Sequence, residues 1–309
     1  MRSFSHVDKV NVVTVTYNSA STIDEFVAGL EAQAEFVGQL IVVDNGSTDS
    51  TLTILERHQS AGRVPIQIIK SANTGFAGGY ATAGRSARYD SDRATLCLNP
   101  DVRLSEGVLE RMLDSMAADP RAGIVTAPLV GLDGLPDSAS IRRLPTLGRA
   151  SIYAVLGRIT PAKWRYNAVP HDASADVTPR SIEATTGALM LVAPRFRSLS
   201  SPIFDTDYWM YGEDLQLCAD AHREGWRVLM VDARPSLHVK GVSSGKPRTY
   251  KSNKAFHDAM FLYFRKNFYR GRFATGLVWL AVQLRFWLSA FVSAAVIASR
   301  EIQTQRGSA

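Results

Sequence analysis

A carboxylate stands at the end of an apolar run between Leu96 and Val102, which reads Leu-Cys-Leu-Asn-Pro-Asp-Val. This run predicts a buried strand that delivers Asp101 to a sheet edge, where open α/β sheets bind their ligands. A carboxylate in that place can hold a divalent cation against a phosphate group. Because Asn-Pro-Asp is also ordinary turn chemistry, the motif indicates a function only together with other parts of a site.

Two earlier segments place polar side chains at the ends of predicted strands. Residues 10–16 are β-branched and end in Thr-Tyr-Asn, and residues 40–43 are followed by Asp44 and Asn-Gly-Ser. The carboxyl ends of neighbouring parallel strands meet at one sheet edge, so these termini are expected to form the floor of one crevice. Asp44 is suited to accept hydrogen bonds from a base or a ribose hydroxyl, and capping a turn explains it equally well.

A glycine-rich segment, Asn-Thr-Gly-Phe-Ala-Gly-Gly at residues 73–79, follows a third predicted strand at residues 64–69. We expect a loop here, before a helix over residues 79–88. Glycines let the backbone approach a ligand, and the N-terminus of the following helix attracts anions. The segment is neither Gly-x-Gly-x-x-Gly nor followed by Gly-Lys-Ser/Thr, so it supports neither a dinucleotide fingerprint nor a phosphate-loop NTPase. A plain loop remains the alternative.

An acid pair, Glu213 and Asp214, opens an amphipathic helix predicted over residues 213–224. Acids at a helix N-terminus are stabilised by the helix dipole, which is the structural explanation. The catalytic explanation is that one of them is the general base for a hydroxyl acceptor.

His238, in Leu-His-Val-Lys-Gly, follows a predicted strand at residues 226–231 and is a second candidate metal ligand. A single histidine is more often structural. The segment after it is cationic and rich in hydroxyl groups, which suits it to fold over a diphosphate.

The order of these elements predicts the fold class. Strand and helix patterns alternate with short connections through residue 128, which indicates a doubly wound, mostly parallel α/β sheet flanked by helices. Residues 131–180 are rich in Gly, Pro, Arg and Ser and are expected to form long loops with a short helix near residues 149–156. A strand at residues 186–192 and two final helical stretches, 252–268 and 273–299, complete the pattern.

Composition narrows the class of protein. Of the 309 residues 46% are hydrophobic, which is enough to bury a core. Cys97 and Cys218 lie far apart in apolar segments, which argues against a disulfide scaffold or a zinc cluster and favours buried thiols in a reducing compartment. The first nine residues are polar and are not followed by a signal-peptide pattern, so we expect the main domain to face the cytoplasm.

Charge divides the chain. From Arg234 onward there are thirteen Lys or Arg against two acids, whereas the first 233 residues carry a net charge of −5. The basic part includes the apolar segment 276–299, which is near the spanning length of about 20 residues. Gln283 and Arg285 lie in its middle and are costly in hydrocarbon. An amphipathic helix lying on an anionic membrane fits better than a span, and packing on the protein's own core is the other alternative. Because the tail is so apolar, a nucleic-acid partner is not expected.

Together, the order Thr-Tyr-Asn, Asp-Asn-Gly-Ser-x-Asp, Asn-x-Gly-Phe-Ala-Gly-Gly, Asn-Pro-Asp, Gly-Glu-Asp-x-x-Leu and His-x-Lys-Gly resembles the family 2 glycosyltransferases of the GT-A fold. Within that family it is most similar to bacterial rhamnosyltransferases that act on polyprenyl-diphosphate-linked N-acetylglucosamine. The resemblance covers roughly residues 10–270. The motif set is specific to the family but only suggestive of the sugar.

The resemblance implies roles for individual residues. A nucleotide-sugar donor would be held by Thr16, Tyr17, Asn18, Asp44, Asn73, Gly75, Phe76, Gly78, Gly79 and Asn99. Asp101 and His238 would bind Mg²⁺ or Mn²⁺ on the donor diphosphate, Asp214 would be the base, and Glu213 would order the site. Asn99 stands where many GT-A enzymes have the first Asp of Asp-x-Asp, so metal binding is expected to be weak without the donor.

The same resemblance implies an inverting transfer, most simply of L-rhamnose from dTDP-rhamnose, to a lipid-linked saccharide at the cytoplasmic face of the plasma membrane. Residues 1–245 would form the catalytic domain, with a donor half to about residue 130 and an acceptor half after it, and residues 246–309 would associate with the membrane. The acceptor diphosphate would meet a basic, hydroxyl-rich set of residues: Lys240, Ser243, Ser244, Lys246, Arg248, Lys251 and Arg265. Galactofuranosyl or N-acetylglucosaminyl transfer, a sugar nucleotidyltransferase and a scaffold without turnover are the alternatives.

Overall fold

The computed structural model describes residues 9–149, 179–197, 202–239, 249–269 and 271–307. The chain forms two compact units. A sheet unit comprises Met1–Asp207 and Glu213–Val239, and a helical unit comprises Tyr208–Gly212 and Lys240–Ala309. The domain boundary expected near residue 245 lies outside the described residues and stays a prediction.

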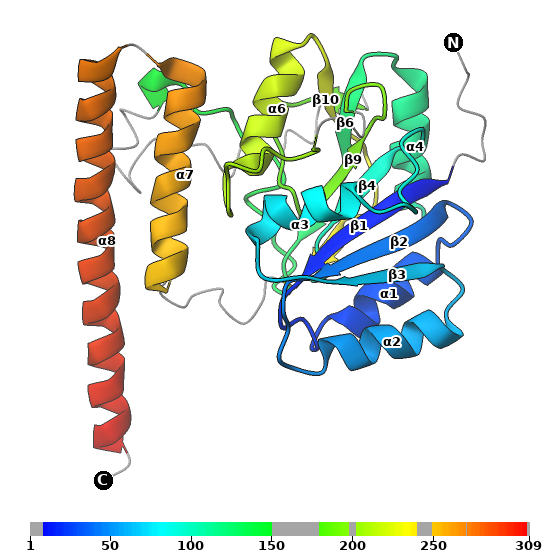
Figure 1. The fold of residues 1–309 in the computed structure, drawn as a ribbon, viewed down its shortest axis with the longest axis horizontal. Coiled ribbons are helices and arrows are strands. Elements are labelled where there is room, and N and C mark those ends of the chain that lie inside the picture. Colours follow the sequence, from blue (N-terminus) through cyan, green and yellow to red (C-terminus); the bar gives the residue numbers. More distant parts are fainter. Residues whose placement is uncertain (1–8, 150–178, 198–201, 240–248, 270, 308–309) are drawn as a thin grey trace. The chain divides into compact units, whose positions relative to one another are not determined.

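The sheet unit is built on an eight-stranded sheet in the order β3-β2-β1-β4-β9-β6-β10-β8 (Figure 1). Its strands are β1 (Val10–Thr16), β2 (Val37–Asp44), β3 (Ile66–Lys70), β4 (Thr95–Leu98), β6 (Ala122–Thr126), β8 (Arg180–Ser181), β9 (Leu189–Val192) and β10 (Arg227–Met230). Neighbouring strands are parallel, except that β9 runs antiparallel to β4 and β6, and β8 to β10. The predicted, mostly parallel sheet is confirmed.

Helices cover both faces of this sheet (Figure 1). They are α1 (Ile23–Glu31), α2 (Thr51–Ala61), α3 (Gly75–Gly84), α4 (Val108–Ala118) and α6 (Glu213–Arg223). Helices α1, α2 and α4 share one face, where the Gln33 side chain after α1 accepts a hydrogen bond from the Leu109 N–H of α4. On the other face, α3 and α6 approach each other around Gly187. In open α/β sheets ligands bind at the carboxyl ends of the strands, which here are the ends of β1, β2 and β4.

A second, three-stranded sheet in the order β5-β11-β7 was not expected from the sequence. It joins β5 (Val102–Arg103), β11 (Ser236–His238) and β7 (Leu129–Val130), with β11 antiparallel to β5 and parallel to β7. His238 therefore lies inside a strand rather than in the segment after one. Strands of two or three residues have no periodicity to read in the sequence.

Helix α3 begins at Gly75, four residues before the predicted start, so the expected loop at residues 75–79 is wrong. Gly75 has a φ of +80°, which favours glycine, and a Cβ on Gly79 would lie 2.6 Å from Val15 Cγ2 of β1. Here a glycine lets the helix pack directly on the sheet. The weak helix propensity of glycine is overridden by this packing.

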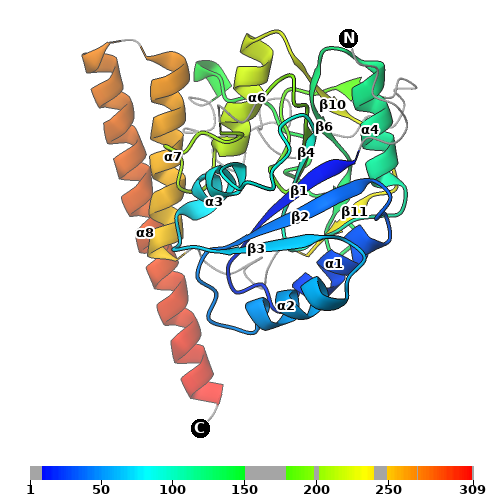
Figure 2. The same ribbon diagram turned by 45° about the vertical axis from the view of Figure 1, so that its right-hand side comes forward.

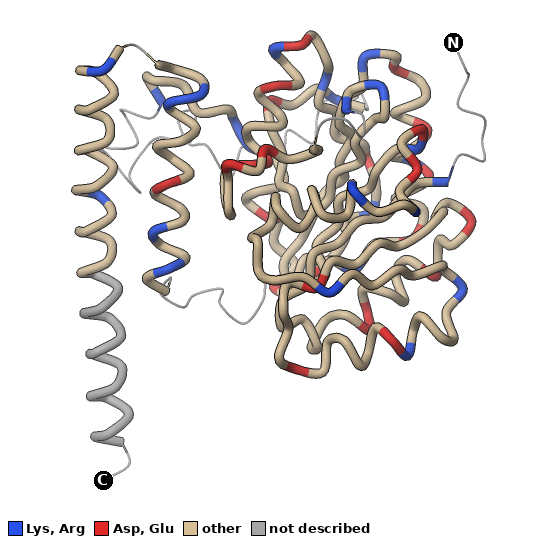
Figure 3. Tube along the Cα trace, in the orientation of Figure 1, with Lys and Arg blue, Asp and Glu red and all other residues tan. Residues whose placement is uncertain are grey.

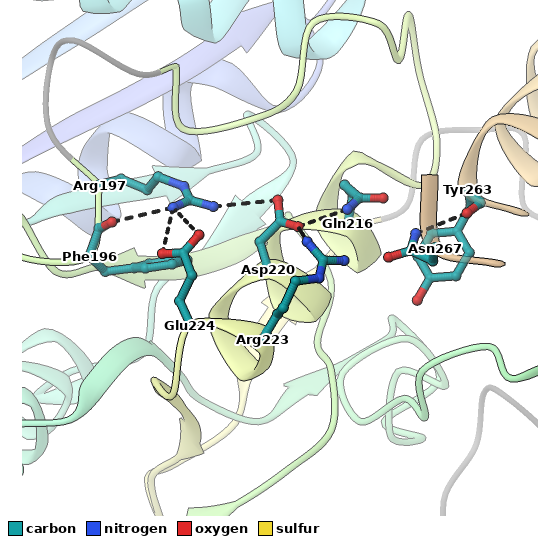
Figure 4. Close-up of polar contacts among 8 residues, drawn as sticks. All are labelled: Phe196, Arg197, Gln216, Asp220, Arg223, Glu224, Tyr263 and Asn267. Carbon is teal, nitrogen blue, oxygen red and sulfur yellow. Dashed lines mark hydrogen bonds and ion pairs between the residues drawn. The ribbon is translucent and has the colours of Figure 1, made fainter. Parts of the chain in front are cut away.

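Helix α6 is fastened to the segment that follows β9 by a network of charges (Figure 4). Arg197 donates to both carboxylate oxygens of Glu224, at 3.0 and 3.1 Å, and lies 3.4 Å from Asp220. Asp220 also accepts from Gln216 and Arg223 of its own helix. This network anchors the end of α6 opposite to the acid pair.

The helical unit consists mainly of α7 (Tyr250–Phe268) and α8 (Arg272–Gly307), which lie side by side (Figures 1 and 2). Both predicted C-terminal helices are therefore present. Ser289 of α8 donates to the Asn253 side chain of α7 at 2.8 Å, which sets the register of the two helices. Close to the end of α7, Asn267 donates to the Tyr263 carbonyl (Figure 4). The short helix expected near residues 149–156 lies outside the described residues except for its first position.

Packing of α3 on β1 generates the first prediction. Gly79→Ala should lower the free energy of unfolding by about 1–3 kcal/mol, the usual cost of overpacking, because its Cβ meets Val15. Chemical denaturation measures this. In the same helix a Cβ on Gly84 meets nothing within 4 Å, so Gly84→Ala should leave stability unchanged or raise it by up to about 1 kcal/mol. Equal effects of the two substitutions would contradict this account.

Candidate active site

The ends of β1 and β2 form the floor of the site through one buried carboxylate. Thr16 pairs with Asp44 in the parallel register, and Thr16 Oγ1 donates to Asp44 Oδ1 at 2.9 Å. Asp44 also accepts from the Ser47 hydroxyl at 2.5 Å and from the Ser47 N–H at 2.9 Å. Asp44 is 1% exposed. These are the contacts of a turn cap, and the predicted contact with a nucleoside stays a prediction.

The loops after β1, β2 and β3 are bound to one another. Asn18, at a φ of 52°, accepts from the Thr48 N–H at 2.8 Å. Asn45 donates to the Gly75 carbonyl at the start of α3, and Asn73 accepts from the Gly75 N–H. The remaining oxygen of Asn45, Oδ1, is buried without a hydrogen-bond partner. Tyr17 projects from this frame with 55% of its surface exposed. Hydrogen bonds thus tie the three loops to one another at the ends of β1, β2 and β3.

Asp101 and His238 are brought together by the second sheet. His238 pairs with Val102, and the Val239 N–H donates to the Asp101 carbonyl at 2.8 Å. The Nε2 atom of His238 then lies 3.4 Å from Asp101 Oδ1, which is buried and has no hydrogen-bond partner. Two ligands of one Mg²⁺ ion in octahedral geometry stand about 3 Å apart. The pair therefore fits a shared divalent cation.

A third residue, Asp137, completes this part of the site. Asp137 Oδ2 lies 2.7 Å from Nδ1 of the His238 ring, and its side chain is 1% exposed. Burial lowers the pKa of His238, but the carboxylates of Asp101 and Asp137 outweigh burial and raise that pKa to about 9. In the part of the chain that the structure describes, no cluster of three or more His, Cys, Asp or Glu is placed to hold a metal ion. Within this part of the chain, a cation held by Asp101 and His238 would take its further ligands from the donor or from water.

Asp214 lies at the start of α6 in an ion pair. Its Oδ2 is 2.5 Å from Arg142 Nη2 and accepts from the Gly187 N–H at 3.1 Å. Its Oδ1 accepts from the Leu215 N–H at 2.7 Å. A carboxylate oxygen has two lone-pair positions. Oδ2 is therefore saturated, whereas Oδ1 keeps one position for a further hydrogen.

The short turn before strand β9 links the two halves of the site. The Asn99 N–H, after β4, donates to the Ala188 carbonyl, next to the Gly187 N–H that binds Asp214. A Cβ on Gly187 would meet both the Phe76 ring of α3 at 3.4 Å and Asp214 Cβ at 3.5 Å. The Asn99 side chain has a buried Oδ1 without a hydrogen-bond partner. Asn99, Phe76 and Asp214 are thus gathered around one short turn.

Glu213 points into the protein, next to this cluster. It is 6% exposed, and its Oε2 has no hydrogen-bond partner. Burial, and then the negative charge of Asp214, raise the pKa of Glu213 to about 8. The side chain is therefore neutral at pH 7, and of the acid pair only Asp214 presents a hydrogen-bonded carboxylate.

Most of the predicted site residues lie at this edge of the sheet. Gly78 and Gly79 lie within α3, where Gly79 packs on Val15. The predicted acceptor residues Lys240, Ser243, Ser244, Lys246 and Arg248 lie outside the described residues. Lys251 lies 4.6 Å above the Trp209 ring, within the helical unit.

Two residues of the site, Arg142 and Asp137, were not predicted from the sequence. Both lie in the loop-rich segment after β7. Arg142 reaches Asp214 because its backbone bridges to Ala184, in both directions, just before β9. Asp137 is held by its N–H, which donates to the Leu129 carbonyl of β7. The Pro-Asp at residues 136–137 resembles the Pro-Asp of the first motif, which is the one local signal that the sequence offers.

The chain matches a known protein family. The family described as "Glycosyl transferase family 2" matches residues 11–173, which is more than half of the chain. The chain belongs to glycosyl transferase family 2. The match begins in β1 and includes the segments that contain Asp44, Gly75 and Asp101 of this glycosyltransferase.

A curated relative is similar to this family 2 glycosyltransferase over a longer part of the chain. It is the N-acetylglucosaminyl-diphospho-decaprenol L-rhamnosyltransferase of Mycobacterium tuberculosis, which is 28% identical over 254 residues. The alignment spans 77% of this chain and 78% of the relative.

Solved structures agree on the GT-A fold. A mannosyltransferase from Pyrobaculum calidifontis in complex with GDP-mannose and Mn²⁺ superposes with a TM-score of 0.55 at 16% identity, covering 96% of this chain and 81% of that one. The glucosyl-3-phosphoglycerate synthase of M. tuberculosis with Mn²⁺, UDP and phosphoglyceric acid has a TM-score of 0.54 at 14% identity, over 85% and 80% of the two chains. At these identities the likeness concerns the fold alone.

The buried Glu213 generates a pH prediction. In the folded protein the pKa of Glu213 is about 8, above the ordinary value of 4.5. Between pH 4.5 and pH 8 the unfolded chain therefore binds fewer protons than the folded protein. Glu213 therefore lowers the free energy of unfolding, and this loss grows from pH 4.5 to 8 by on the order of 1 kcal/mol per pH unit. Glu213→Gln should remove this cost, and its gain in unfolding free energy should be larger at pH 8 than at pH 5.

Urea denaturation at a series of pH values measures this difference. Glu110→Gln on the exposed side of α4 is the matched control and should follow the pH profile of the wild type. A Glu213→Gln protein whose stability gain is constant from pH 5 to 8 would show that Glu213 is ionised in the fold.

Proposed function

We propose that this chain is an inverting rhamnosyltransferase that moves L-rhamnose from dTDP-rhamnose to N-acetylglucosamine linked to a polyprenyl diphosphate. The observation that carries this proposal is the site itself. One edge of the sheet brings together the Asp101–His238 pair and a carboxylate, Asp214, that keeps one free lone-pair position. The relative from M. tuberculosis, named as a rhamnosyltransferase on a decaprenol-linked N-acetylglucosamine, supports the choice of sugar and acceptor.

Asp101 and His238 would hold a divalent cation, Mg²⁺ or Mn²⁺, between the protein and the donor diphosphate. The buried Oδ1 of Asp101 without a hydrogen-bond partner and its 3.4 Å separation from His238 Nε2 fit such an ion. When bound, the cation supplies positive charge against the nucleoside diphosphate that leaves. Because Asn99 replaces a carboxylate, the protein offers few charged ligands, and the donor phosphates must complete the site.

The donor nucleoside would lie along the ends of β1, β2 and β3. Tyr17 is exposed there and is suited to stack on a base, and Asn73 lies beside the first turn of α3. Asp44 is saturated by Thr16, Ser47 and the Gly46 N–H in the structure. Its contribution to nucleoside binding would be to hold the Ser47 turn. A direct contact would require a hydroxyl or N–H of the nucleoside to replace the Ser47 hydroxyl as a donor to Asp44.

Asp214 would act as the general base through its Oδ1 atom. A hydroxyl of the acceptor sugar would donate to that oxygen, lose its proton to it, and attack the anomeric carbon from the face opposite to the nucleotide. Configuration inverts in such a single displacement. Arg142 and the Gly187 N–H hold the other oxygen, Oδ2, and so fix the direction in which Oδ1 points.

Transfer of rhamnose is tested directly by mass spectrometry with dTDP-rhamnose, Mg²⁺ and a polyprenyl-diphosphate N-acetylglucosamine acceptor. UDP-galactofuranose and UDP-N-acetylglucosamine serve as competing donors. Asp214→Asn should lower turnover by about 10²–10⁴-fold, the usual contribution of a general base, with donor binding retained. Asp220→Asn, on the same helix but in the Arg197 network (Figure 4), is the control and should remain active. Transfer of a competing donor instead of rhamnose would overturn the sugar assignment.

The helical unit would hold the enzyme at an anionic membrane. Helix α8 contains the one segment of the described residues that is long and apolar enough to cross a membrane, Arg272–Phe291, and only 11% of it is buried. Packing on a protein core is therefore disfavoured. Exposed large apolar side chains recur along this segment: Phe273, Leu277, Trp279, Leu280, Leu284, Trp287, Leu288 and Phe291.

Charge on the neighbouring helix favours an anionic surface at the cytoplasmic face. Helix α7 carries four Lys or Arg against one acid, Asp258 (Figure 3). Basic groups beside an apolar helix face are typical of segments that bind anionic lipid. The two units thus supply the two halves of the proposed function, with catalysis in the sheet unit and attachment in the helical unit.

Replacing Leu284, Trp287 and Leu288 together by Gln should release the protein from vesicles of phosphatidylglycerol and phosphatidylcholine. Each side chain contributes about 1.5–3 kcal/mol when buried, so binding in a sedimentation assay should fall at least about 100-fold. Gln at the exposed Leu132 and Leu135 of the sheet unit is the control and should leave binding unchanged. Removing residues 276–309 should have the same effect as the triple substitution. Retention of either variant on the vesicles would refute attachment through α8.

A further inference from the structure

We infer that Asp137 is a positioning residue that orients His238 as a metal ligand. This inference rests on the proposed metal-dependent transfer and adds to it a residue outside the sequence motifs. A histidine that ligates a metal through one ring nitrogen commonly donates its other N–H to a carboxylate, which fixes the orientation and tautomer of the ring. Asp137 stands in that relation to His238, at 2.7 Å from Nδ1.

Backbone pairing builds this contact from three separate parts of the chain. His238, in β11, is paired on one side with Val102 of β5, immediately after Asp101. On the other side β11 is paired with β7, and Leu129 of β7 accepts from the Asp137 N–H at 2.8 Å. The histidine ring is therefore held between two carboxylates. Asp101 faces Nε2, and Asp137 faces Nδ1.

Asp137 is itself fixed in place. Its Oδ1 accepts from the Ala139 N–H at 2.9 Å, and the Ser140 N–H donates to its carbonyl at 2.9 Å. With one oxygen committed to this turn and the other to His238, the carboxylate has a single orientation. It directs His238 Nε2 toward Asp101 rather than toward the turn.

The arrangement also argues against Asp137 as a ligand in its own right. The oxygen nearest to the site, Oδ2, is occupied by the His238 ring, and the side chain is 1% exposed. Asp101, by contrast, is 23% exposed and keeps a buried oxygen without a hydrogen-bond partner. Asp137 thus acts on a cation only through the histidine.

The test measures Mn²⁺ binding to the full-length protein by electron paramagnetic resonance, alone and with dTDP. Asp137→Asn keeps the shape of the side chain but lets its amide donate to Nδ1, which removes the preference for one tautomer. Affinity for Mn²⁺ in the presence of dTDP should fall about 10- to 100-fold, the usual effect of losing such a partner. Binding of dTDP without metal should not change. Asp133→Asn, in the same turn region, is the control and should bind Mn²⁺ like the wild type.

Two further measurements separate positioning from a structural role. In ¹⁵N-histidine spectra the His238 signals should show a proton on Nδ1 in the wild type with Mg²⁺ and dTDP, and a mixture of tautomers in Asp137→Asn. In a His238→Gln background, Asp137→Asn should cause no additional loss of Mn²⁺ affinity, since the residue acts through the histidine. Asp137→Glu should restore part of the affinity.

Unchanged Mn²⁺ binding in Asp137→Asn, or an additional loss in the His238→Gln background, would overturn the inference. These outcomes differ from a failure of the proposed function. A wild-type protein that binds Mn²⁺ with dTDP but transfers no rhamnose would overturn the proposed reaction and leave the role of Asp137 standing. A wild-type protein without Mn²⁺ binding would overturn both.

Discussion

The pairing of β11 with β5 is the interaction on which the rest of the site depends. It joins two very short strands, yet it places His238 directly against Asp101, which lies far away in the sequence. The same strand pairs on its other side with β7 and so brings Asp137 to the opposite nitrogen of the ring. The proposed site for a divalent cation therefore depends on this small sheet.

A second constraint is the burial of acidic side chains. Charged groups lose hydration when they are buried, and the loss is tolerated only if each is paired or neutralised. The protein does this in a different way at each position. Asp44 accepts hydrogen bonds from a turn, Asp214 is paired with Arg142, and Glu213 stays protonated. The carboxylate with a buried oxygen left without a hydrogen-bond partner, Asp101, is the one that faces the histidine.

Burial also makes the two residues of the acid pair, Glu213 and Asp214, differ in their roles. Glu213 and Asp214 are adjacent at a helix N-terminus, where the helix dipole favours both of them alike. Tertiary contacts make them unequal, because one side chain turns into the core and the other meets Arg142 and the Gly187 N–H. The helix therefore presents a single hydrogen-bonded carboxylate, Asp214, to the site, and Arg142 and the Gly187 N–H fix its orientation.

The amino-acid sequence is enough to predict the mostly parallel sheet, the motifs at its strand ends and the separation of an acidic region from a basic, apolar tail. These follow from local patterns, namely hydrophobic periodicity, turn residues and charge. It did not reveal β5, β7 and β11, because strands of two or three residues have no period. Nor did it reveal the start of α3 at Gly75, where packing on Val15 outweighs the helix propensity of glycine. Only the tertiary structure selected Arg142 and Asp137, since an ordinary arginine and an ordinary aspartate in a loop-rich segment acquire a role through the distant groups that they meet.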